Sequence, residues 1–338
     1  MNSYAVFIGR FQPPTLAHKK IIKKALSEND YLIIVIGSYM TASTIKNPWN
    51  FEQRKELILG MFKEDIQQRL FFIAIKDYPY DDQQWVTYIQ NRVYNIAGNS
   101  HIKLYGHFKD NSSYYLKYFP DWELINCKKV NINKTRIDAT KIRKMLFDHF
   151  TYGIDKQIDD NVYDFLMNWT KTKDYQNLLE DYLYYQTYQQ PYKELKYKPI
   201  FNTVDCVVKN DNNILLIKRK NCPGKDLYAL PGGFLNSDEW IVDAAIRELI
   251  EETSLIIPEK IIRDCIVKNK VYDYPYRSLR GRLITTAFLI DLSKVNNQKL
   301  IVKGSDDASS AEWISLDDVY KLEDKFFDDH FHIIKDIL

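Results

Sequence analysis

Three glutamates near residue 250 stand at a spacing that suits a divalent cation. Glu251 and Glu252 follow Glu248 by three and four residues, so a helix would bring all three onto one face. Like charges in this arrangement repel by roughly a few tenths of a kcal/mol per pair unless something lies between them. Carboxylate oxygens suit Mg2+ or Mn2+, which keep several waters and bridge substrate phosphates. The spacing predicts a metal site at Glu248, Glu251 and Glu252. Arg247 is expected to orient Glu251 or Glu239 without contacting the metal itself.

A loop that runs into a helix is needed to position these side chains. Asp238 and Glu239 are expected to open the helix, because acidic groups suit the positive end of the helix dipole. The residues that follow give the helix one apolar side, formed by Ala244, Ala245, Ile246, Leu249 and Ile250. The alternative is a solvated acidic helix face, which is the usual meaning of a charge run.

The stretch 233–255 resembles the box of nudix hydrolases, G-x5-E-x7-R-E-U-x-E-E-x-G-U. Serine takes the place of the second glycine, at Ser254. The resemblance implies that Glu251 and Glu252 are catalytic, that water activated by the metal attacks a diphosphate, and that a box carboxylate or a glutamate outside the box is the base. The matching positions are Gly233, Glu239, Arg247, Glu248, Leu249, Glu251, Glu252 and Leu255.

Three arginines follow the box at positions 277, 280 and 282. Arg277, Arg280 and Arg282 are candidates to meet a pyrophosphate, and contacts at the surface or in a dimer are the alternative.

A second group of residues suited to chemistry lies near the N-terminus. Gly9 ends an apolar run and would let a phosphate approach the backbone. A helix begun by Pro13 and Pro14 would aim its first N–H groups at that phosphate, with His18 one turn in. These are the parts of a triphosphate site, although a histidine on a first helical turn can equally be structural.

The stretch Gly9 to His18 resembles the G-x-F-x-P-x-[HT]-x-x-H signature of nucleotidyltransferases, and Ile137 to Arg143 resembles their I-S-x-T-x-I-R segment. The resemblance makes His18 and Arg143 catalytic. For Arg143 the alternative is a surface arginine on a helix. The implied ATP-binding residues are Gly9, Arg10, Phe11, Thr15, His18, Thr140 and Arg143.

Three further segments, residues 47–54, 82–85 and 106–113, resemble loops of the archaeal type of nicotinamide mononucleotide (NMN) adenylyltransferase. The resemblance implies that Arg54 binds a phosphate, that Trp85 stacks on the nicotinamide ring and that Asp110 contacts the substrate. The alternative for Trp85 is a place in the hydrophobic core.

Apolar runs alternate with helical patterns through the first half of the chain. Continuous apolar strands separated by helices indicate a parallel sheet covered on both faces, which gathers ligands at the carboxyl ends of its strands. The expected strands are Tyr4 to Ile8, Tyr31 to Ile36, Leu70 to Ile75 and Ile102 to Tyr105, with helices from Phe51 to Phe62 and Gln83 to Ile96.

Two helices are expected between Asp155 and Tyr192, then a linker, and a hairpin over 203–218 that opens a second domain. A strand is expected from Leu283 to Ile290 and a helix from Leu316 to Leu322. The predicted fold is α/β, with an N-terminal Rossmann-like nucleotidyltransferase domain (1–190) and a C-terminal α+β nudix domain (191–338).

Composition narrows the class of protein. The 338 residues carry a formal net charge of +2 with no local run of Lys and Arg, which argues against nucleic acid as a partner. The four cysteines form no C-x-x-C pair, and no apolar run approaches the roughly 20 residues that cross a bilayer. We therefore expect a cytoplasmic protein with reduced thiols and no membrane partner.

Both pairs of motifs, in this order, resemble the bifunctional NMN adenylyltransferase and ADP-ribose pyrophosphatase family. The resemblance implies Mg2+ or Mn2+ as cofactor and ATP, NMN, NAD and ADP-ribose as ligands. A homo-oligomer is a further expectation. Two alternatives remain at this point. The first domain could adenylylate another phosphate, such as that of flavin mononucleotide or phosphopantetheine, and the nudix half could be a non-catalytic sensor of metabolites.

Overall fold

The structure is a computed structural model that describes residues 2–106, 111–127, 131–132, 135–136, 138–295 and 300–338. Contacts divide the chain into two compact units, Met1–Leu179 and Glu180–Leu338. Helix α7 (Lys173–Gln189) runs through this division. The domain boundary expected between residues 190 and 191 lies just beyond the end of α7 and stays a prediction.

A five-stranded parallel sheet forms the centre of the first unit, in the order β3-β2-β1-β4-β5. Its central strands β1 and β2 are almost continuously apolar, as expected of strands that are buried on both faces. The strand bounds are Tyr4–Gly9 (β1), Tyr31–Ile36 (β2), Leu70–Ala74 (β3), Ile102–Gly106 (β4) and Glu123–Asn126 (β5).

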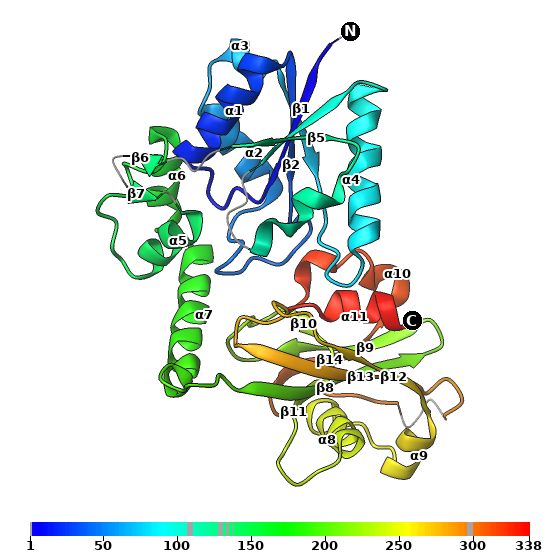
Figure 1. The fold of residues 1–338 in the computed structure, drawn as a ribbon. Coiled ribbons are helices and arrows are strands. Elements are labelled where there is room, and N and C mark those ends of the chain that lie inside the picture. The colour runs from blue at the N-terminus through cyan, green and yellow to red at the C-terminus, as the bar shows by residue number, and fades with distance from the viewer. Residues whose placement is uncertain (1, 107–110, 128–130, 133–134, 137, 296–299) are drawn as a thin grey trace. The chain divides into compact units, whose positions relative to one another are not determined.

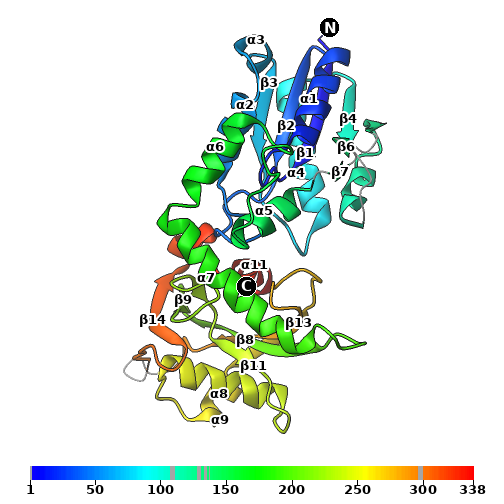
Figure 2. The same cartoon turned by 90° about the vertical axis from the view of Figure 1, so that its left-hand side faces the viewer.

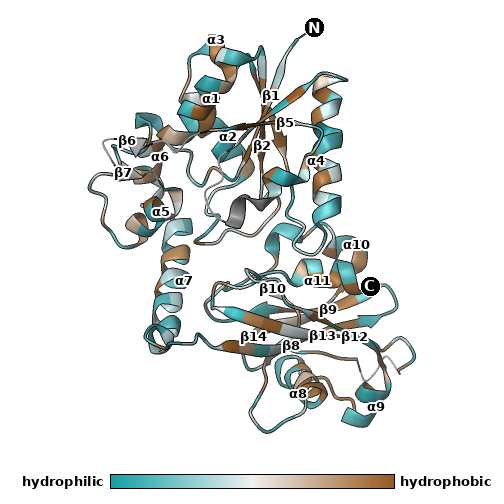
Figure 3. Ribbon diagram, viewed as in Figure 1, coloured by the Kyte–Doolittle hydropathy of each residue, from teal (hydrophilic) through white to brown (hydrophobic). Residues whose placement is uncertain are grey.

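Helices cover both faces of this sheet, with α4 on one side and α1 and α2 on the other (Figure 1). Side chains alternate along a strand, so Val6 and Ile8 point towards Ile89 and Val93 of α4, and the residues between them point the other way. The brown strands inside the teal outer helix surfaces show the same division (Figure 3). The helices are α1 (Leu16–Glu28), α2 (Phe51–Gly60), α3 (Glu64–Gln67), α4 (Asp82–Ala97), α5 (Ala139–Phe147) and α6 (Asp160–Trp169), with a 3-10 helix η1 (Asn111–Tyr118) and a short pair β6 (Asn131–Ile132) and β7 (Thr135–Arg136).

Helix α1 begins later than predicted. Its first residue is Leu16, with Thr15 as the N-cap, whereas Pro13 and Pro14 lie in the preceding loop behind a cis Gln12–Pro13 peptide. The Thr15 N–H donates to His18 Nδ1 at 2.9 Å, which is one half of a capping box. The predicted start at the prolines is therefore wrong, because the cap lies one residue beyond them.

A seven-stranded mixed sheet forms the centre of the second unit. The main order is β10-β9-β8-β13-β12, with β11 paired to β8 and β14 paired to β9. Strands β8 and β13 are parallel and the other pairs are antiparallel. The bounds are Ile200–Asn210 (β8), Asn213–Arg219 (β9), Tyr228–Ala229 (β10), Gly232–Phe234 (β11), Ile266–Tyr272 (β12), Arg282–Asp291 (β13) and Ala308–Ser315 (β14).

Two helices lie on opposite faces of the second sheet, α8 (Ile241–Thr253) on one and α11 (His330–Ile337) on the other (Figures 1 and 2). Val204 and Cys206 of β8 pack against Ala245 and Leu249 of α8 in one apolar cluster. Thr203 and Asp205 therefore face away from α8, because successive side chains of a strand alternate. The remaining elements are η2 (Gln190–Tyr192), α9 (Glu259–Asp264), α10 (Leu316–Val319) and η4 (Glu323–Lys325).

The predicted α/β class, with a parallel Rossmann-like sheet followed by a mixed-sheet domain, is confirmed. Two details of the second unit were predicted wrongly. Helix α8 begins at Ile241, so Asp238 and Glu239 precede it, because the Glu239 carboxylate accepts from the Asn236 N–H at 2.7 Å and holds the loop closed. Helix α10 ends at Val319 after one turn instead of reaching Leu322. Within the described ranges, none of the helices combines the length and hydropathy needed to cross a bilayer.

Candidate active sites

The stretch Gly9 to His18, predicted as the first site, lies where β1 ends and α1 begins. Phe11 adopts a left-handed backbone (φ 53°), which turns the chain sharply after Gly9. The buried Gln12 side chain then ties this loop to Trp49, donating to its carbonyl oxygen at 2.8 Å and accepting from its N–H at 3.2 Å. The loop that carries Arg10 is thus held against the segment before α2.

His18 is fixed by the first turn of its own helix. Its Nδ1 accepts from the Thr15 N–H at 2.9 Å and lies 3.0 Å from Thr15 Oγ1, and its ring centroid is 4.9 Å from that of Phe11. The imidazole therefore lies beside Phe11 and Thr15, two other predicted ATP-binding residues.

Arg143 joins the two halves of the nucleotidyltransferase signature in space. It is only 7% exposed, and it donates to the carbonyl oxygens of Gln12 and Ile45 and, at 3.3 Å, to Thr140 Oγ1. The alternative of a surface arginine is therefore wrong. Burial, together with the charge of Arg10, lowers the pKa of Arg143 to about 10. Asp138 is the N-cap of α5, and its Oδ1 accepts from the Thr140 N–H at 2.9 Å.

Arg54, predicted as a phosphate ligand, is buried and bound to the backbone. It is 0% exposed, and burial lowers its pKa to about 10. Its guanidinium donates to four backbone carbonyl oxygens, those of Arg10 (2.9 Å), Gly37 (2.7 Å), Ser38 (3.2 Å) and Asn50 (3.0 Å). These hydrogen bonds occupy most donors of the Arg54 guanidinium, so we expect Arg54 to act mainly by holding the loop that carries Arg10.

Lys46 was missed by the sequence analysis. Burial, then the charges of Arg10 and Arg143, lower its pKa to about 8 although Asp77 acts in the opposite direction. Lys46, Arg10, Arg54 and Arg143 form what we call the cationic cluster, in which Asp77 and Asp138 offset only part of the positive charge. A lone lysine in the turn before Pro48 carries no sequence signal that could have revealed it.

Trp85 lies at the first turn of α4, half-buried. Its ring centroid is 5.8 Å from that of Tyr115 and 6.0 Å from that of Phe119, at the edge of the α4-side core. Both the stacking role and the core alternative are compatible with this position. The expected contact at Asp110 lies outside the described residues.

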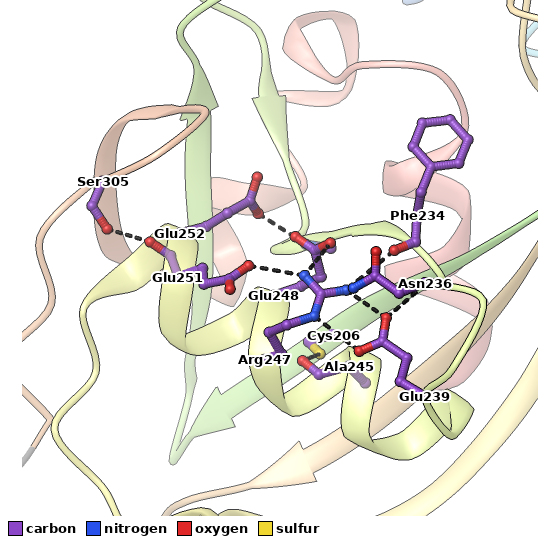
Figure 4. A network of polar contacts seen from close by, with 11 residues as sticks. Cys206, Phe234, Asn236, Glu239, Ala245, Arg247, Glu248, Glu251, Glu252 and Ser305 are labelled. Carbon is purple, nitrogen blue, oxygen red and sulfur yellow. Dashed lines mark hydrogen bonds and ion pairs between the residues drawn. The ribbon is translucent and has the colours of Figure 1, made fainter.

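In the nudix box, Arg247 lies at the centre of the carboxylates (Figure 4). Its guanidinium bonds Glu239 at 2.7 and 2.9 Å, and Glu248 and Glu251 at 2.9 Å each. It thus orients both Glu239 and Glu251, the two partners between which the sequence left a choice. The Arg247 contact lowers the pKa of Glu239, whereas burial raises that of Glu248.

Glu252 is the most deeply buried carboxylate of the box. It is 5% exposed, accepts from the Gly232 N–H at 2.9 Å, and has its pKa raised to about 8, first by burial. The Glu248 carboxylate lies so close to Gly233 that a Cβ at residue 233 would come within 2.4 Å of Glu248 Oε1. The box therefore needs glycine at position 233 for space.

The donor set fits a hard divalent cation. Glu252 is buried and Glu248 is half-buried. Beyond the effect of burial, the charge of Glu248 raises the pKa of Glu252, and the charges of Glu251 and Asp306 raise that of Glu248, so a cation would relieve this crowding. Arg247 already supplies one positive charge beside Glu248 and Glu251. Among the described residues no three His, Cys, Asp or Glu side chains are already drawn together as a metal site. The assignment of Glu248, Glu251 and Glu252 as ligands stays a prediction.

Ser254 keeps the backbone of the family's glycine. It has φ 51° and ψ 29°, the left-handed conformation that ends α8, and its N–H donates to the Ile250 carbonyl oxygen. A non-glycine residue there costs roughly 1 kcal/mol. The Ser254 hydroxyl contacts Ser305 Oγ at 3.0 Å. The turn after the helix is thus preserved despite the substitution.

The three arginines after the box have different surroundings. Arg277 is buried and bonds both oxygens of Asp329, at 2.8 and 3.0 Å, so its charge is already paired. Arg282 lies 3.9 Å from Asp273 near the surface. Arg280 lies over the rings of Phe234 and Phe327 and lines a cavity beside Gly232, together with Arg219, which the sequence analysis missed.

The fold and the two sites define a two-unit protein in which a nucleotidyltransferase-type unit precedes a nudix unit. The model described as Cytidylyltransferase-like matches residues 6–77, and the model described as NUDIX domain matches residues 199–337. A nicotinamide/nicotinic acid mononucleotide adenylyltransferase of Acinetobacter baylyi is 37% identical over 180 residues, which are 53% of this chain and 93% of that protein.

An ADP-ribose pyrophosphatase of Methanocaldococcus jannaschii is 40% identical over 135 residues, 40% of this chain and 71% of that protein. The crystal structure of a bifunctional NMN adenylyltransferase/ADP ribose pyrophosphatase from Francisella tularensis, complexed with AMP and a Mn ion, has a TM-score of 0.91 at 34% identity and covers 100% of this chain and 98% of that one. The chain belongs to this family of bifunctional NMN adenylyltransferase/ADP-ribose pyrophosphatase proteins.

Proposed function

We propose that the first unit transfers the adenylyl group of ATP to NMN, giving NAD and pyrophosphate, and that the second unit hydrolyses ADP-ribose or a related nucleoside diphosphate derivative. The observation that carries the first activity is the cationic cluster at the carboxyl end of β1. Buried cations that repel one another are stabilised by an anion of matching charge, and a triphosphate supplies it.

The adenylyl transfer needs no general base. The 5′-phosphate of the mononucleotide is already an anionic nucleophile; it attacks the α phosphorus of ATP, and pyrophosphate leaves with the electrons of the broken bond. The protein supplies alignment and charge neutralisation, for which we assign His18, Arg10, Lys46 and Arg143. Arg54 acts through the Arg10 loop, whose carbonyl oxygen it binds.

In the second unit a divalent cation, Mg2+ or Mn2+, supplies activation of water and neutralisation of the diphosphate when bound. Glu248, Glu251 and Glu252 would hold it. Arg247 keeps Glu239 fixed and sets the positions of Glu248 and Glu251, and Gly232 holds Glu252 through its N–H.

The finer assignments belong to this proposal as well. We place the protein in the cytoplasm, where ATP and reduced thiols are found, and the homo-oligomer stays a prediction. Functionally we assign residues 1–190 to the transferase and residues 191–338 to the hydrolase.

One experiment tests both halves. The protein is incubated with Mg2+, ATP and, in separate samples, NMN, flavin mononucleotide or phosphopantetheine, and then with ADP-ribose alone, and the products are identified. NAD from NMN only, and AMP with ribose 5-phosphate from ADP-ribose, are the expected results. Product from another acceptor would overturn the transferase assignment. Binding of ADP-ribose without cleavage would make the second unit a sensor.

A further inference from the structure

A small polar recess opens on the α11 side of the second sheet, on the face opposite α8. The cavity measures about 30 Å3, and Thr203, Asp205 and His330 are among its lining residues. A water needs at least about 10 Å3 of such space, so this recess has room for one or two small polar groups and none for a nucleobase. We call Thr203, Asp205 and His330 the polar recess.

Thr203 lines the recess with a buried hydroxyl. Its side chain is only 7% exposed, and within the described part of the chain its Oγ1 has no hydrogen bond. Burying a hydroxyl without a hydrogen-bond partner is unfavourable, and native proteins rarely leave one in this state. The Thr203 hydroxyl is therefore placed to meet a group that the protein alone does not supply.

His330 presents an N–H to the same space. Its Nδ1 accepts from the Leu230 N–H at 2.9 Å, so that nitrogen carries no proton. Burial lowers the pKa of His330, which keeps the ring neutral with its proton on Nε2. His330 is 7% exposed, and Nε2 lies 3.8 Å from Asp205 Oδ1, which is beyond hydrogen-bond distance.

Asp205 presents an acceptor. Its Oδ2 accepts from Thr285 Oγ1 at 2.6 Å and lies 3.6 Å from Arg277 Nη2, and these contacts hold the carboxylate in place. Its Oδ1 is the atom that faces His330. The recess thus offers a hydrogen-bond acceptor from Asp205, a donor from His330, and the Thr203 hydroxyl, which can donate or accept. A single alcohol group can satisfy them, because it donates one hydrogen bond and accepts two.

The recess adjoins the hydrolytic site. Gly232 lines the cavity, and its N–H binds the Glu252 carboxylate. Arg219 and Arg280 line the cavity too; the Arg219 guanidinium lies 4.1 Å from the centroid of the Phe327 ring. A substrate whose diphosphate lies between these arginines and the box carboxylates would bring a neighbouring sugar to the recess.

We propose that the polar recess binds a hydroxyl group of a ribose next to the diphosphate of the nudix substrate. The inference rests on the proposed hydrolysis of a nucleoside diphosphate derivative. It makes the second unit selective for diphosphates that carry a sugar, through Thr203, Asp205 and His330. The hydroxyl belongs to the adenosine ribose or to the terminal ribose, and the substrates below separate the two.

The test uses the full chain and the substitution Thr203→Val, which keeps the shape of the side chain and removes only the unpaired hydroxyl. Values of kcat/KM are measured for ADP-ribose and for four analogues, each lacking the 2′ or 3′ hydroxyl of one ribose. For one analogue, the kcat/KM of the wild-type protein should be at least about tenfold lower than for ADP-ribose, because a site that hydrogen-bonds a hydroxyl discriminates against a substrate without it. The kcat/KM of Thr203→Val for ADP-ribose should be about twofold to tenfold below that of the wild type, the loss expected from one hydrogen bond. For the analogue that lacks the recognised hydroxyl, the kcat/KM of Thr203→Val should be little lower than its own value for ADP-ribose.

Thr286→Val is the matched control. Thr286 pairs with Val204 in the sheet and therefore points away from the recess, so its variant should keep wild-type kcat/KM on every substrate. The melting temperature of Thr203→Val should not fall below that of wild type, and its adenylyl transfer should be unchanged.

The outcomes separate the two proposals. A wild-type protein that cleaves ADP-ribose and all four analogues equally well would overturn the recess and leave the hydrolase intact. If Thr203→Val lowered kcat/KM equally for every substrate, the recess proposal would also be overturned, because that result would mean that the recess holds only a structural water. No cleavage of ADP-ribose by the wild type would instead defeat the proposed hydrolase.

Discussion

Arg143 donates a hydrogen bond from its Nε to the carbonyl oxygen of Ile45, 3.2 Å away and 98 residues earlier in the chain. On the other side of Lys46, the Asn47 side chain accepts from Arg10 at 3.5 Å. Lys46 is therefore held between two arginines by its own neighbours in the chain. This geometry gives it a lowered pKa and leads to the first prediction.

Lys46 should make ATP binding sensitive to alkaline pH. Its pKa of about 8 lies below the ordinary 10.5, so the side chain loses its charge as the pH rises through 8 in the ATP-free protein. The KM for ATP should rise several-fold between pH 7.5 and 9.5, and Lys46→Arg, which stays charged, should flatten that rise. Lys46→Gln should have a high KM for ATP already at pH 7. The control is Lys23→Gln at an exposed lysine of α1.

The same shift predicts a sign for stability. Between about pH 8 and 10.5 the unfolded chain holds the Lys46 proton and the folded chain does not, so this residue's contribution to stability rises with pH in that window. Lys46→Gln should remove this contribution in ATP-free melting curves. A KM for ATP that is independent of pH in the wild type would contradict the placement of Lys46 near phosphate.

His18→Ala should lower adenylyl transfer by at least about a hundredfold, the loss expected from roughly 3 kcal/mol of transition-state stabilisation. It also removes the acceptor of the Thr15 N–H, so a stability loss of about 1 kcal/mol is expected. His18→Gln separates the two effects, because glutamine at this position of a capping box can accept the same N–H. It should keep the melting temperature and still lose transfer. Transfer near the wild-type rate in both variants would show that His18 is structural.

Trp85→Ala should weaken NMN binding and leave the affinity for ATP nearly unchanged, because stacking on the nicotinamide ring touches one substrate only. Trp85→Phe keeps an aromatic ring against Tyr115 and Phe119 and should retain much of the NMN affinity. Isothermal titration with each substrate measures both. An equal loss for the two substrates, or a fall of many degrees in melting temperature, would assign Trp85 to the core.

Glu252→Gln should abolish most ADP-ribose hydrolysis without destabilising the metal-free protein. Glutamine can still accept from the Gly232 N–H, and the substitution removes a charge from a buried, crowded place. Stabilisation of the second unit by Mn2+ or Mg2+ in melting curves should weaken, while adenylyl transfer in the same sample continues. The exposed Glu259→Gln is the control. Unchanged hydrolysis in Glu252→Gln would remove Glu252 from the metal site.

Local patterns account for what could be predicted from the sequence. The strands of the first sheet are short apolar runs, and the nudix box has its spacing because a helix repeats every 3.6 residues. The roles of Arg54 and Lys46 depend on segments that meet only in the folded chain. Arg54 binds carbonyl oxygens of residues 10, 37, 38 and 50, and no sequence pattern shows that these four converge.

The polar recess was equally hidden in the sequence. Thr203 reads as one residue of a strand, and His330 belongs to a C-terminal helix that was not anticipated. The start of α8 was misplaced because acidic residues before a helix look like its first turn. The contacts of Glu239 with the Asn236 N–H and with Arg247 show that it belongs to the loop.

Helix α7 has a consequence for anyone who separates the two activities. Its first half packs Tyr175 against Phe147 in the first unit, and its second half packs Tyr188 against Phe201 in the second, where Asp181 also accepts from the Gly224 N–H at 3.0 Å. A hydrolase half that starts at residue 191 would lack Asp181 and Tyr188, and should melt at a lower temperature than one that starts at residue 173. Helix α7 thus contributes to both units. A hydrolase unit produced on its own must include residues of α7 that the sequence assigns to the transferase domain.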